Sequence, residues 1–415
     1  MLSGASEVEA SQLIRDLDFS TSLRSGRNDK QGFIMALQTS FTIYASADEL
    51  PADWDTLAKA NIFLSRAYLG VLQTSAPANM ECSFIGLFEG STLRGIALAQ
   101  YINISSINTY VENQSGFSLK HYLYKKFSSH VLIIGNNMLT GQNAYVLDAD
   151  FPETEALKML LKAQQELKRQ YCKRCIYINL LTIKDFNSQE LPDFKAAGYN
   201  GYFKFCTQPN MIFDIKPKWQ DIEGYLPDLN TKYRTQYNRA RKKAEGIEKR
   251  KLNAEEIEAH AACIQRLYLT VAGNASFNTF HLPEGHFKAF KDALGNDFLF
   301  YGYFIDGKLI GFNTLIKNGT DMDTYFLGYD DALQKEKMLY LNMLYDMVAY
   351  AIKKQFRHII FARSAMEIKS SVGARAEEVY GLIKHTNPLI NLFMGRLFQY
   401  FDPVITWKPR SPFKG

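Results

Sequence analysis

The feature that most constrains the fold is a repeat inside the sequence. Residues 84–96 read FIGLFEGSTLRGI, and residues 300–312 read FYGYFIDGKLIGF. Each copy has an apolar and aromatic run, a turn with glycine, and a second run, which is the pattern of a β-hairpin. The residues that recur at identical spacing are Phe84, Gly86, Phe88, Leu93 and Gly95 in the first copy and Phe300, Gly302, Phe304, Leu309 and Gly311 in the second.

The elements after the hairpin also follow one order in both copies. A helical pattern at 153–170 precedes an apolar strand, and a second at 336–355 precedes another. A last apolar run then closes each half, at 202–215 and at 379–385. The repeat therefore predicts a duplicated domain, with each half completed by its own last run.

A chain of 415 residues is long enough for two domains. We predict an α/β (α+β) fold of two tandem domains, each a mixed, mostly antiparallel sheet flanked by helices. Pro217 and Pro227 interrupt the pattern between the halves. The predicted segments are a poorly structured leader at 1–40, an N-terminal domain at 41–216, a basic helical connector at 217–252 and a C-terminal domain at 253–415 with an apolar C-terminal helix.

Composition excludes several classes of protein. Hydrophobic residues make up 47% and charged residues 22%, which is the composition of a globular protein rather than a disordered one. A net charge of +5 is too small for a dedicated nucleic-acid coat. The chain lacks a signal-like N-terminus and any membrane-spanning apolar run, and its cysteines are odd in number and scattered. We therefore expect a cytoplasmic protein.

Several motifs of known chemistry are missing from the sequence. It has no Walker A loop, no GxGxxG after a strand and no GxSxG elbow. The histidines form no HExxH group, and Cys172 and Cys175 make a single pair without a second at zinc-site spacing, so we expect buried thiols and no metal site.

Residues 232–251 form a strongly basic stretch with only two acidic side chains, Glu245 and Glu248. On a helix, Lys232, Arg239 and Lys243 would lie on one stripe, with Arg234 nearby. Two interpretations remain open. The stretch is either a solvated charged face or a site for an anionic ligand, such as a phosphorylated cofactor, a lipid headgroup or a tRNA backbone.

Two polar loops follow predicted strands, a place where loops commonly carry ligand contacts. After HIIFA, Arg363 could bind a phosphate or carboxylate, Glu367 could take a proton and Lys369 could hold an anion. These three residues could instead form an ion-pair network that caps the sheet edge. After VLII, the loop with Asn136 and Asn137 is either a binding loop or a turn.

The tail at 387–401 is apolar on almost every side of a possible helix, and Trp407, Lys408 and Arg410 follow it. This stretch is too short to span a bilayer. It either packs against a domain or makes a peripheral membrane contact through residues 387–410.

The order of motifs in the C-terminal half resembles that of bacterial FemAB-like acyltransferases of the GNAT superfamily. These proteins have two GNAT-like domains in tandem, in agreement with the duplication, and the resemblance extends over about residues 41–405. The motifs that carry it are KYRTQYNRARKK at 232–243, the second hairpin, MDTYFLGYD at 322–330 and RSAMEIKSSVGA at 363–374.

The resemblance implies transfer of an acyl group from a thioester or an aminoacyl ester to an amine. A GNAT fold splays two strands so that a backbone N–H meets the acyl carbonyl, and we expect this splay at residues 324–328. Tyr325 and Tyr329 could protonate the leaving group there. An amine must lose a proton before it attacks, and Glu367, or Asp323 through water, are the candidate bases.

The resemblance leaves the donor open. GNAT proteins hold the donor pyrophosphate with a glycine-containing loop, but the corresponding residues 330–341 read DDALQKEKMLYL. Acyl-CoA, an acyl carrier protein and aminoacyl-tRNA are therefore all candidate donors, and the basic helix could serve each of them.

Three functions follow as hypotheses. The first is an N-acyltransferase that moves an acyl group from acyl-CoA or an acyl carrier to the amine of a small molecule or amino acid, with a possible link to lipids. The second is an aminoacyl-tRNA-dependent transferase acting on a peptide precursor. The third is a GNAT-like protein that binds an anionic ligand without catalysis.

Overall fold

The computed structural model describes residues 38–106, 128–206, 208–274, 278–396 and 407–414. The leader predicted at 1–40 lies almost wholly outside the described residues, and so does part of the apolar tail.

The N-terminal sheet has the strand order β1-β2-β3-β4-β6-β15-β7, with β5 paired to β3. Its neighbours are antiparallel except β4 and β6, which are parallel. The strands are β1 (Thr39–Tyr44), β2 (Met80–Glu89), β3 (Thr92–Asn103), β4 (His130–Ile134), β5 (Tyr145–Leu147), β6 (Leu180–Phe186), β7 (Phe203–Phe205) and β15 (Tyr380–His385).

The C-terminal sheet has the order β14-β8-β13-β12-β11-β10-β9. It too has one parallel pair at its centre, between β12 and β13. The strands are β8 (Asn210–Asp214), β9 (Glu248–Lys251), β10 (Phe298–Ile305), β11 (Lys308–Asn318), β12 (Asp321–Tyr329), β13 (His358–Ala362) and β14 (Arg375–Glu377). Two mixed sheets of the same design confirm the predicted fold class.

The duplicated hairpins match in detail. In the first, Leu87 pairs with Gly95 and a bulge follows at Phe88. In the second, Tyr303 pairs with Gly311 and a bulge follows at Phe304. A bulge at the same step of both hairpins is what one inherited strand pair would produce.

Helices cover both faces of each sheet, and alternate residues of the strands face different cores. Ile85 packs with α4 on one face of the N-terminal sheet, and Leu299 packs with α12 on one face of the C-terminal sheet. Phe84 and Phe300 instead share a third core, which joins the two halves. The helices are α1 (Trp54–Ala58), α2 (Arg66–Thr74), α4 (Glu153–Lys173), α5 (Leu191–Ala196), α6 (Ile222–Tyr225), α7 (Thr231–Lys243), α8 (Ala254–Ala259), α9 (Ala261–Gly273), α10 (His286–Leu294), α11 (Asp331–Lys337), α12 (Leu339–Lys353), α13 (Met366–Ser371) and α14 (Pro388–Asn391).

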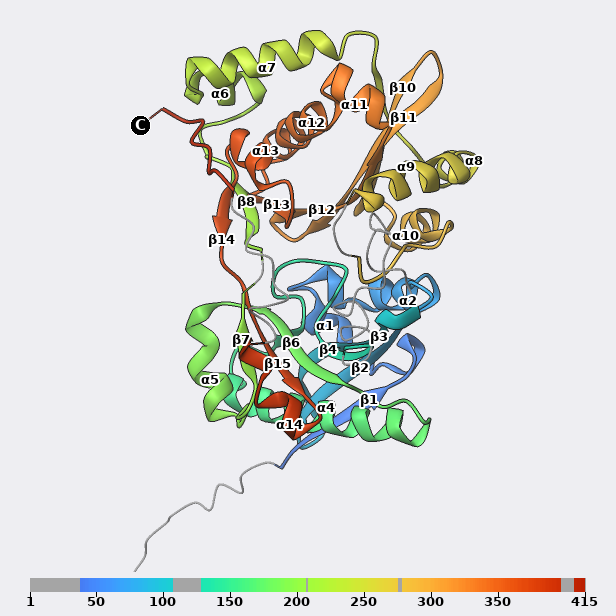
Figure 1. The fold of residues 1–415 in the computed structure, drawn as a ribbon, viewed down its shortest axis with the longest axis vertical. Helices are drawn as coiled ribbons and strands as arrows, with labels where there is room; N and C mark the ends of the chain where they lie inside the picture. Colours follow the sequence, from blue (N-terminus) through green and yellow to red (C-terminus); the bar gives the residue numbers. More distant parts are fainter. Residues whose placement is uncertain (1–37, 107–127, 207, 275–277, 397–406, 415) are drawn as a thin grey trace, which may run out of the picture. The chain divides into compact units, whose positions relative to one another are not determined.

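One prediction about the halves is wrong, because they exchange strands. β15, from the end of the chain, lies between β6 and β7 of the N-terminal sheet, and β8 lies between β14 and β13 of the C-terminal sheet (Figure 1). The last run of the C-terminal half therefore lies in the N-terminal sheet, and the run 202–215 is divided, with β7 in the N-terminal sheet and β8 in the C-terminal sheet. The domain limits at 216 and 253 remain a prediction, and sheet membership does not follow them.

The carboxyl ends of the two parallel strand pairs are candidate places for a ligand site. β4 and β6 pair as far as Ile134 and Ile183, and β12 and β13 pair as far as Asp323 and Ile360. The strands of each pair separate beyond these points, and ligands of α/β sheets commonly bind at such carboxyl ends.

None of the described helices is both long and apolar enough to cross a membrane.

Candidate active site

The strand β12 contains a bulge at Tyr325 and Phe326. Leu315 pairs with Thr324 and Asn313 pairs with Leu327, so two residues of β12 face Thr314 alone. The Thr314 hydroxyl donates to the Phe326 carbonyl oxygen at 2.6 Å and accepts from the Phe326 N–H at 3.0 Å. The irregularity falls within residues 324–328, where the splay was predicted, and bulges next to active sites re-aim a side chain.

The redirected side chain of Tyr325 meets a buried histidine. The Tyr325 hydroxyl lies 2.9 Å from Nε2 of His286, and Nδ1 of His286 lies 2.8 Å from the Ser75 carbonyl oxygen. A carbonyl oxygen only accepts, so Nδ1 carries the proton and Nε2 accepts from the tyrosine. Burial lowers the pKa of His286 to about 4, which keeps the ring neutral at pH 7.

A second tyrosine reaches Tyr325 from the N-terminal half. Tyr68, on α2, hydrogen-bonds Tyr325 and accepts from Nδ2 of Asn136 at 2.9 Å. Since the single hydroxyl proton of Tyr325 points at His286, Tyr68 is the donor in the bond between the two tyrosines. Burial raises the pKa of both phenols, so both are protonated at rest.

The hydrogen bonds continue from Asn136 to an ion-pair group. Nζ of Lys184 donates to the carbonyl oxygens of Asn136 and Leu139, each at 2.9 Å, and pairs with Asp185. Asp185 is buried and also pairs with Arg363. Burial lowers the pKa of Lys184. We use the term polar chain for the connected set Arg363, Asp185, Lys184, Asn136, Tyr68, Tyr325 and His286.

Asp323 lies on β12 beside the polar chain. Its side chain hydrogen-bonds Asn318, and its charge raises the pKa of Tyr68. Its Oδ2 atom is buried and has no hydrogen-bond partner within the described part of the chain. Burial raises the pKa of Asp323 well above the ordinary range of a carboxyl, which makes its carboxylate a stronger base than an exposed one.

Part of the chain that carries this site matches a known protein family. Residues 231–370, which include β12, β13 and α12, match the model of the acetyltransferase (GNAT) domain. This match makes the segment 231–370 similar to a GNAT domain. With the matching design of the N-terminal sheet, the chain has the predicted architecture of two tandem GNAT-like halves.

No curated protein sequence matches the chain. Among solved structures, FemX is 12% identical, with 85% of this chain and 98% of that chain covered and a TM-score of 0.49. A tandem GNAT protein from the clavulanic acid biosynthesis pathway is 10% identical, with 85% and 99% covered and a TM-score of 0.49. The C-terminal domain of a putative lysylphosphatidylglycerol synthetase from Agrobacterium fabrum is 9% identical, with 86% and 96% covered and a TM-score of 0.48.

The GNAT domain does not bring every predicted residue to the polar chain. The side chain of Glu367 points to the C-terminal segment, where it pairs with Arg410 at 2.8 Å and accepts from the Lys408 N–H at 3.1 Å. The Arg410 guanidinium lowers the pKa of Glu367, which makes it a weaker base. Tyr329 is half-buried and hydrogen-bonds Gln334. Both residues are thus less suited to catalysis than Asp323 and Tyr325.

Lys369 is buried and hydrogen-bonds backbone atoms of the protein itself. Its Nζ donates to the carbonyl oxygens of Phe361 at 2.6 Å, Arg363 at 2.7 Å and Ala362 at 3.4 Å, at the end of β13. Burial lowers the pKa of Lys369 to about 7. These bonds occupy the ammonium group and correct the expectation that it holds an anion. Arg363 pairs with Asp185 of the other half rather than with Glu367.

The basic helix α7 packs against the beginning of α12. Arg241 pairs with Asp346 at 2.8 Å, and Nδ2 of Asn342 donates to the carbonyl oxygens of Ala240 at 2.9 Å and Lys337 at 3.1 Å. These contacts hold the end of α7 at the junction of α11 and α12, where a GNAT domain has its pyrophosphate loop. Of the predicted stripe, Lys232, Arg239 and Lys243 are exposed and Arg234 is half-buried.

Asn137 belongs to the same loop as Asn136 but points elsewhere. Its N–H donates to Oε1 of Gln100 at 2.6 Å, and its Nδ2 donates to the Thr279 hydroxyl at 2.9 Å. The loop is therefore held to the C-terminal half and is more than a turn.

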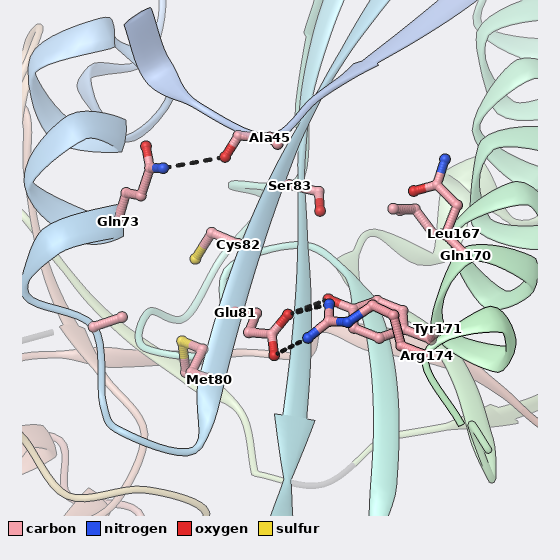
Figure 2. Close-up of a pocket in the computed structure, with 11 residues that line it drawn as sticks. Ala45, Gln73, Met80, Glu81, Cys82, Ser83, Leu167, Gln170, Tyr171 and Arg174 are labelled. Atoms are coloured by element: carbon pink, nitrogen blue, oxygen red, sulfur yellow. Dashed lines mark hydrogen bonds and ion pairs between the residues drawn. The ribbon is translucent and has the colours of Figure 1, made fainter. Parts of the chain in front are cut away.

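A separate pocket of about 350 Å³ lies in the N-terminal half (Figure 2). Glu81 and Arg174 pair across it through bonds of 2.7 and 2.9 Å, beside Tyr171 and Cys82. Among the described residues, the lining of this pocket includes no member of the polar chain.

Cys172 and Cys175, expected to be buried, are exposed. No group of three metal-ligating side chains occurs among the described residues.

Sequence reasoning missed His286, Tyr68, Lys184 and Asp185. His286 and Tyr68 carried no signal, because neither belongs to a motif of known chemistry and the partner of each lies far away in the sequence. Lys184 and Asp185 did carry one. They lie near the carboxyl end of β6, and Arg363 follows the carboxyl end of β13. The rule that ligands bind at such strand ends, which selected Arg363, selects Lys184 and Asp185 as well.

Proposed function

We propose that the protein is an N-acyltransferase that moves an acyl group from an acyl-CoA or an acyl carrier thioester to the amine of a small molecule or amino acid. The observation that carries the proposal is the hydrogen bond from Tyr325 to the neutral His286 at the bulge of β12, inside the GNAT domain.

In the proposed reaction the amine nitrogen attacks the thioester carbonyl, a C–N bond forms and the C–S bond breaks. Asp323 takes the proton that the amine loses, a role supported by its buried, unpartnered oxygen and raised pKa. Tyr325 gives a proton to the leaving sulfur. The hydroxyl of Tyr68 then donates to the phenolate oxygen of Tyr325, and His286 positions the tyrosine at rest.

The donor phosphates would lie at the junction of α11 and α12. The sequence there has no glycine loop, but Arg239 and Lys243 of α7 are exposed next to it, and Lys335 of α11 adds a further cation. Lysine and arginine are ordinary phosphate-binding groups. This placement supports a phosphorylated donor, and both CoA and the prosthetic arm of an acyl carrier are phosphorylated.

A second candidate function is aminoacyl-tRNA-dependent transfer, favoured by the exposed cations along α7, which would suit a nucleic-acid backbone. Acyl-CoA, an acyl carrier protein and aminoacyl-tRNA can be separated by thermal shift, because a ligand that binds the folded state raises the melting temperature. We expect stabilisation by acyl-CoA or an acyl carrier, and stabilisation by tRNA alone would favour the second candidate. If no donor stabilises and no acyl transfer is detected, the non-catalytic alternative gains.

Tyr325→Phe tests the chemistry. Loss of the hydroxyl should lower kcat by about 10²- to 10⁴-fold, the usual size of a general acid's contribution, with donor binding in the thermal shift retained. Tyr350→Phe is the matched control, because Tyr350 is a half-buried tyrosine on α12 outside the polar chain. Tyr329→Phe should cost much less than Tyr325→Phe. Equal activity of Tyr325→Phe and Tyr350→Phe would contradict the proposed role.

A further inference from the structure

An apolar surface lies at the end of the N-terminal sheet where β6 begins and β15 ends. Tyr177, Leu389, Leu392 and Phe393 are 69%, 72%, 79% and 54% exposed, respectively. Leu389 lies in α14, and Leu392 and Phe393 follow in the next turn with the spacing i+3 and i+4 from it. Because Leu392 keeps a helical backbone conformation, the three side chains lie on one side of the segment. We call these four residues the protruding patch.

Hydrogen bonds bring Tyr177 to the same end of β6 and β15 as α14. The hydroxyl of Thr386, which precedes α14, donates to the Ile178 carbonyl oxygen at 2.8 Å. The Thr386 N–H donates to the Asn179 carbonyl oxygen at 2.8 Å. Since Tyr177 is the neighbour of Ile178 in the chain, it lies beside the beginning of α14.

The segment that presents the patch is firmly attached. Nδ2 of Asn391 donates to the Gly201 carbonyl oxygen at 2.8 Å, and its Oδ1 accepts from the His385 N–H at 2.8 Å. Met394, on the opposite side of the segment, is buried in the core that joins the halves. The leucines and the phenylalanine are thus held outward by a packed inner face.

The chain segments next to the patch carry an excess of basic residues. Residues 384–396 include Lys384 and Arg396 and no acidic residue. The end of α4 leads directly to Tyr177, and it carries Lys168, Arg169, Lys173 and, as its cap, Arg174. Arg169 pairs with Glu166 at 3.1 Å, and Arg174 pairs with Glu81, as Figure 2 shows. Lys168, Lys173 and Arg396 add charge beyond those two ion pairs.

We propose that the protruding patch and these cations dock on the surface of an anionic lipid bilayer. Leucine, phenylalanine and tyrosine are the side chains that enter the boundary between headgroups and acyl chains, while lysine and arginine attract anionic headgroups. The charge complementarity favours this occupant over a neutral apolar partner. The inference goes beyond the proposed function and holds for any substrate of the candidate active site.

Flotation of the full chain with lipid vesicles tests the proposal. The chain should bind vesicles that contain phosphatidylglycerol, bind vesicles of phosphatidylcholine alone far more weakly, and lose binding at high salt because salt screens the attraction. Leu392→Ser and Phe393→Ser should each lower the partition coefficient by about tenfold, the equivalent of one large apolar side chain.

Leu269→Ser is the matched control. Leu269, on α9, is 42% exposed but belongs to the C-terminal half and not to the patch. It should leave vesicle binding unchanged, and circular dichroism and the thermal midpoint should show that all three variants are folded. Absence of binding to anionic vesicles would overturn the proposal, as would an equal loss in Leu269→Ser. Self-association of the chain that Leu392→Ser abolishes, without vesicle binding, would assign the patch to a second copy instead.

Discussion

The two halves differ most at the point where their central strands separate. In the C-terminal half, β12 runs on through a bulge of two residues, Tyr325 and Phe326. In the N-terminal half, a loop of residues 135–144 occupies the same place between β4 and β5. Leu98 holds both ends of this loop, since it accepts from the Gly135 N–H and donates to the Ala144 carbonyl oxygen, each at 2.9 Å.

This difference shows how a duplicated fold can build one site rather than two. The C-terminal half keeps the bulge that aims a tyrosine, while the loop of the N-terminal half places Asn136 against Tyr68, and Tyr68 against that tyrosine. One copy carries the proposed proton donor, and the other copy supports it.

The largest expected effect concerns the ion pair between the halves. Asp185 and Arg363 lie in corresponding places, each just beyond the parallel pairing of its own sheet. Asp185→Ala leaves Lys184 buried without its partner and should lower the free energy of unfolding by about 3–5 kcal/mol. Arg363→Ala should cost less, because Lys184 still pairs with Asp185. Denaturant unfolding of both variants measures this, and equal losses would contradict the asymmetry.

The next effect is the pH dependence of stability, which compares two tyrosine–histidine pairs, one in each half. His286 bonds Tyr325, and Nδ1 of His130 lies 2.8 Å from the hydroxyl of Tyr101. Burial lowers the pKa of His286 from 6.5 to about 4, so between these pH values the unfolded chain binds a proton that the folded chain does not. Stability should therefore fall as pH falls through this window, by about 3 kcal/mol in total.

Unfolding experiments at several pH values check the sign of this effect. His286→Gln should remove most of the loss between pH 6.5 and 4. Burial also lowers the pKa of His130, but that side chain is only partly buried, so His130→Gln should remove a smaller part. A larger change for His130→Gln would reverse the comparison.

The smallest effect concerns how closely helices approach the two sheets. A Cβ on Gly328 of β12 would lie 2.6 Å from backbone atoms of Leu267 and Tyr268 in α9. Gly328→Ala should therefore destabilise the chain by about 1–3 kcal/mol and lower turnover, because β12 carries Tyr325. The corresponding residue of β5 is Val146, and Val146→Ala should cost about 1 kcal/mol or less. Thermal unfolding measures both, and a neutral Gly328→Ala would contradict the close contact.

The sequence predicted the fold better than the site. The repeat of Phe84, Gly86 and Phe88 located both hairpins, because strand and turn patterns are local. It did not reveal the exchange of β8 and β15, because an apolar strand fits the centre of either sheet.

For the site, the resemblance to GNAT proteins selected Asp323 and Tyr325, which lie at or beside the polar chain. It also selected Glu367 and Lys369, whose partners became visible only in three dimensions. No local pattern marks His286, since its role depends on Ser75 and Tyr325, both far from it in the sequence.

The exchange of strands also has a consequence for synthesis on the ribosome. β15 is an interior strand of the N-terminal sheet, yet it is translated after all the other strands of that sheet. Until residue 385 leaves the exit tunnel, β6 has an open edge and β7 has no partner in the sheet. The nascent N-terminal half must therefore wait, with unpaired backbone groups, until β15 has been synthesised.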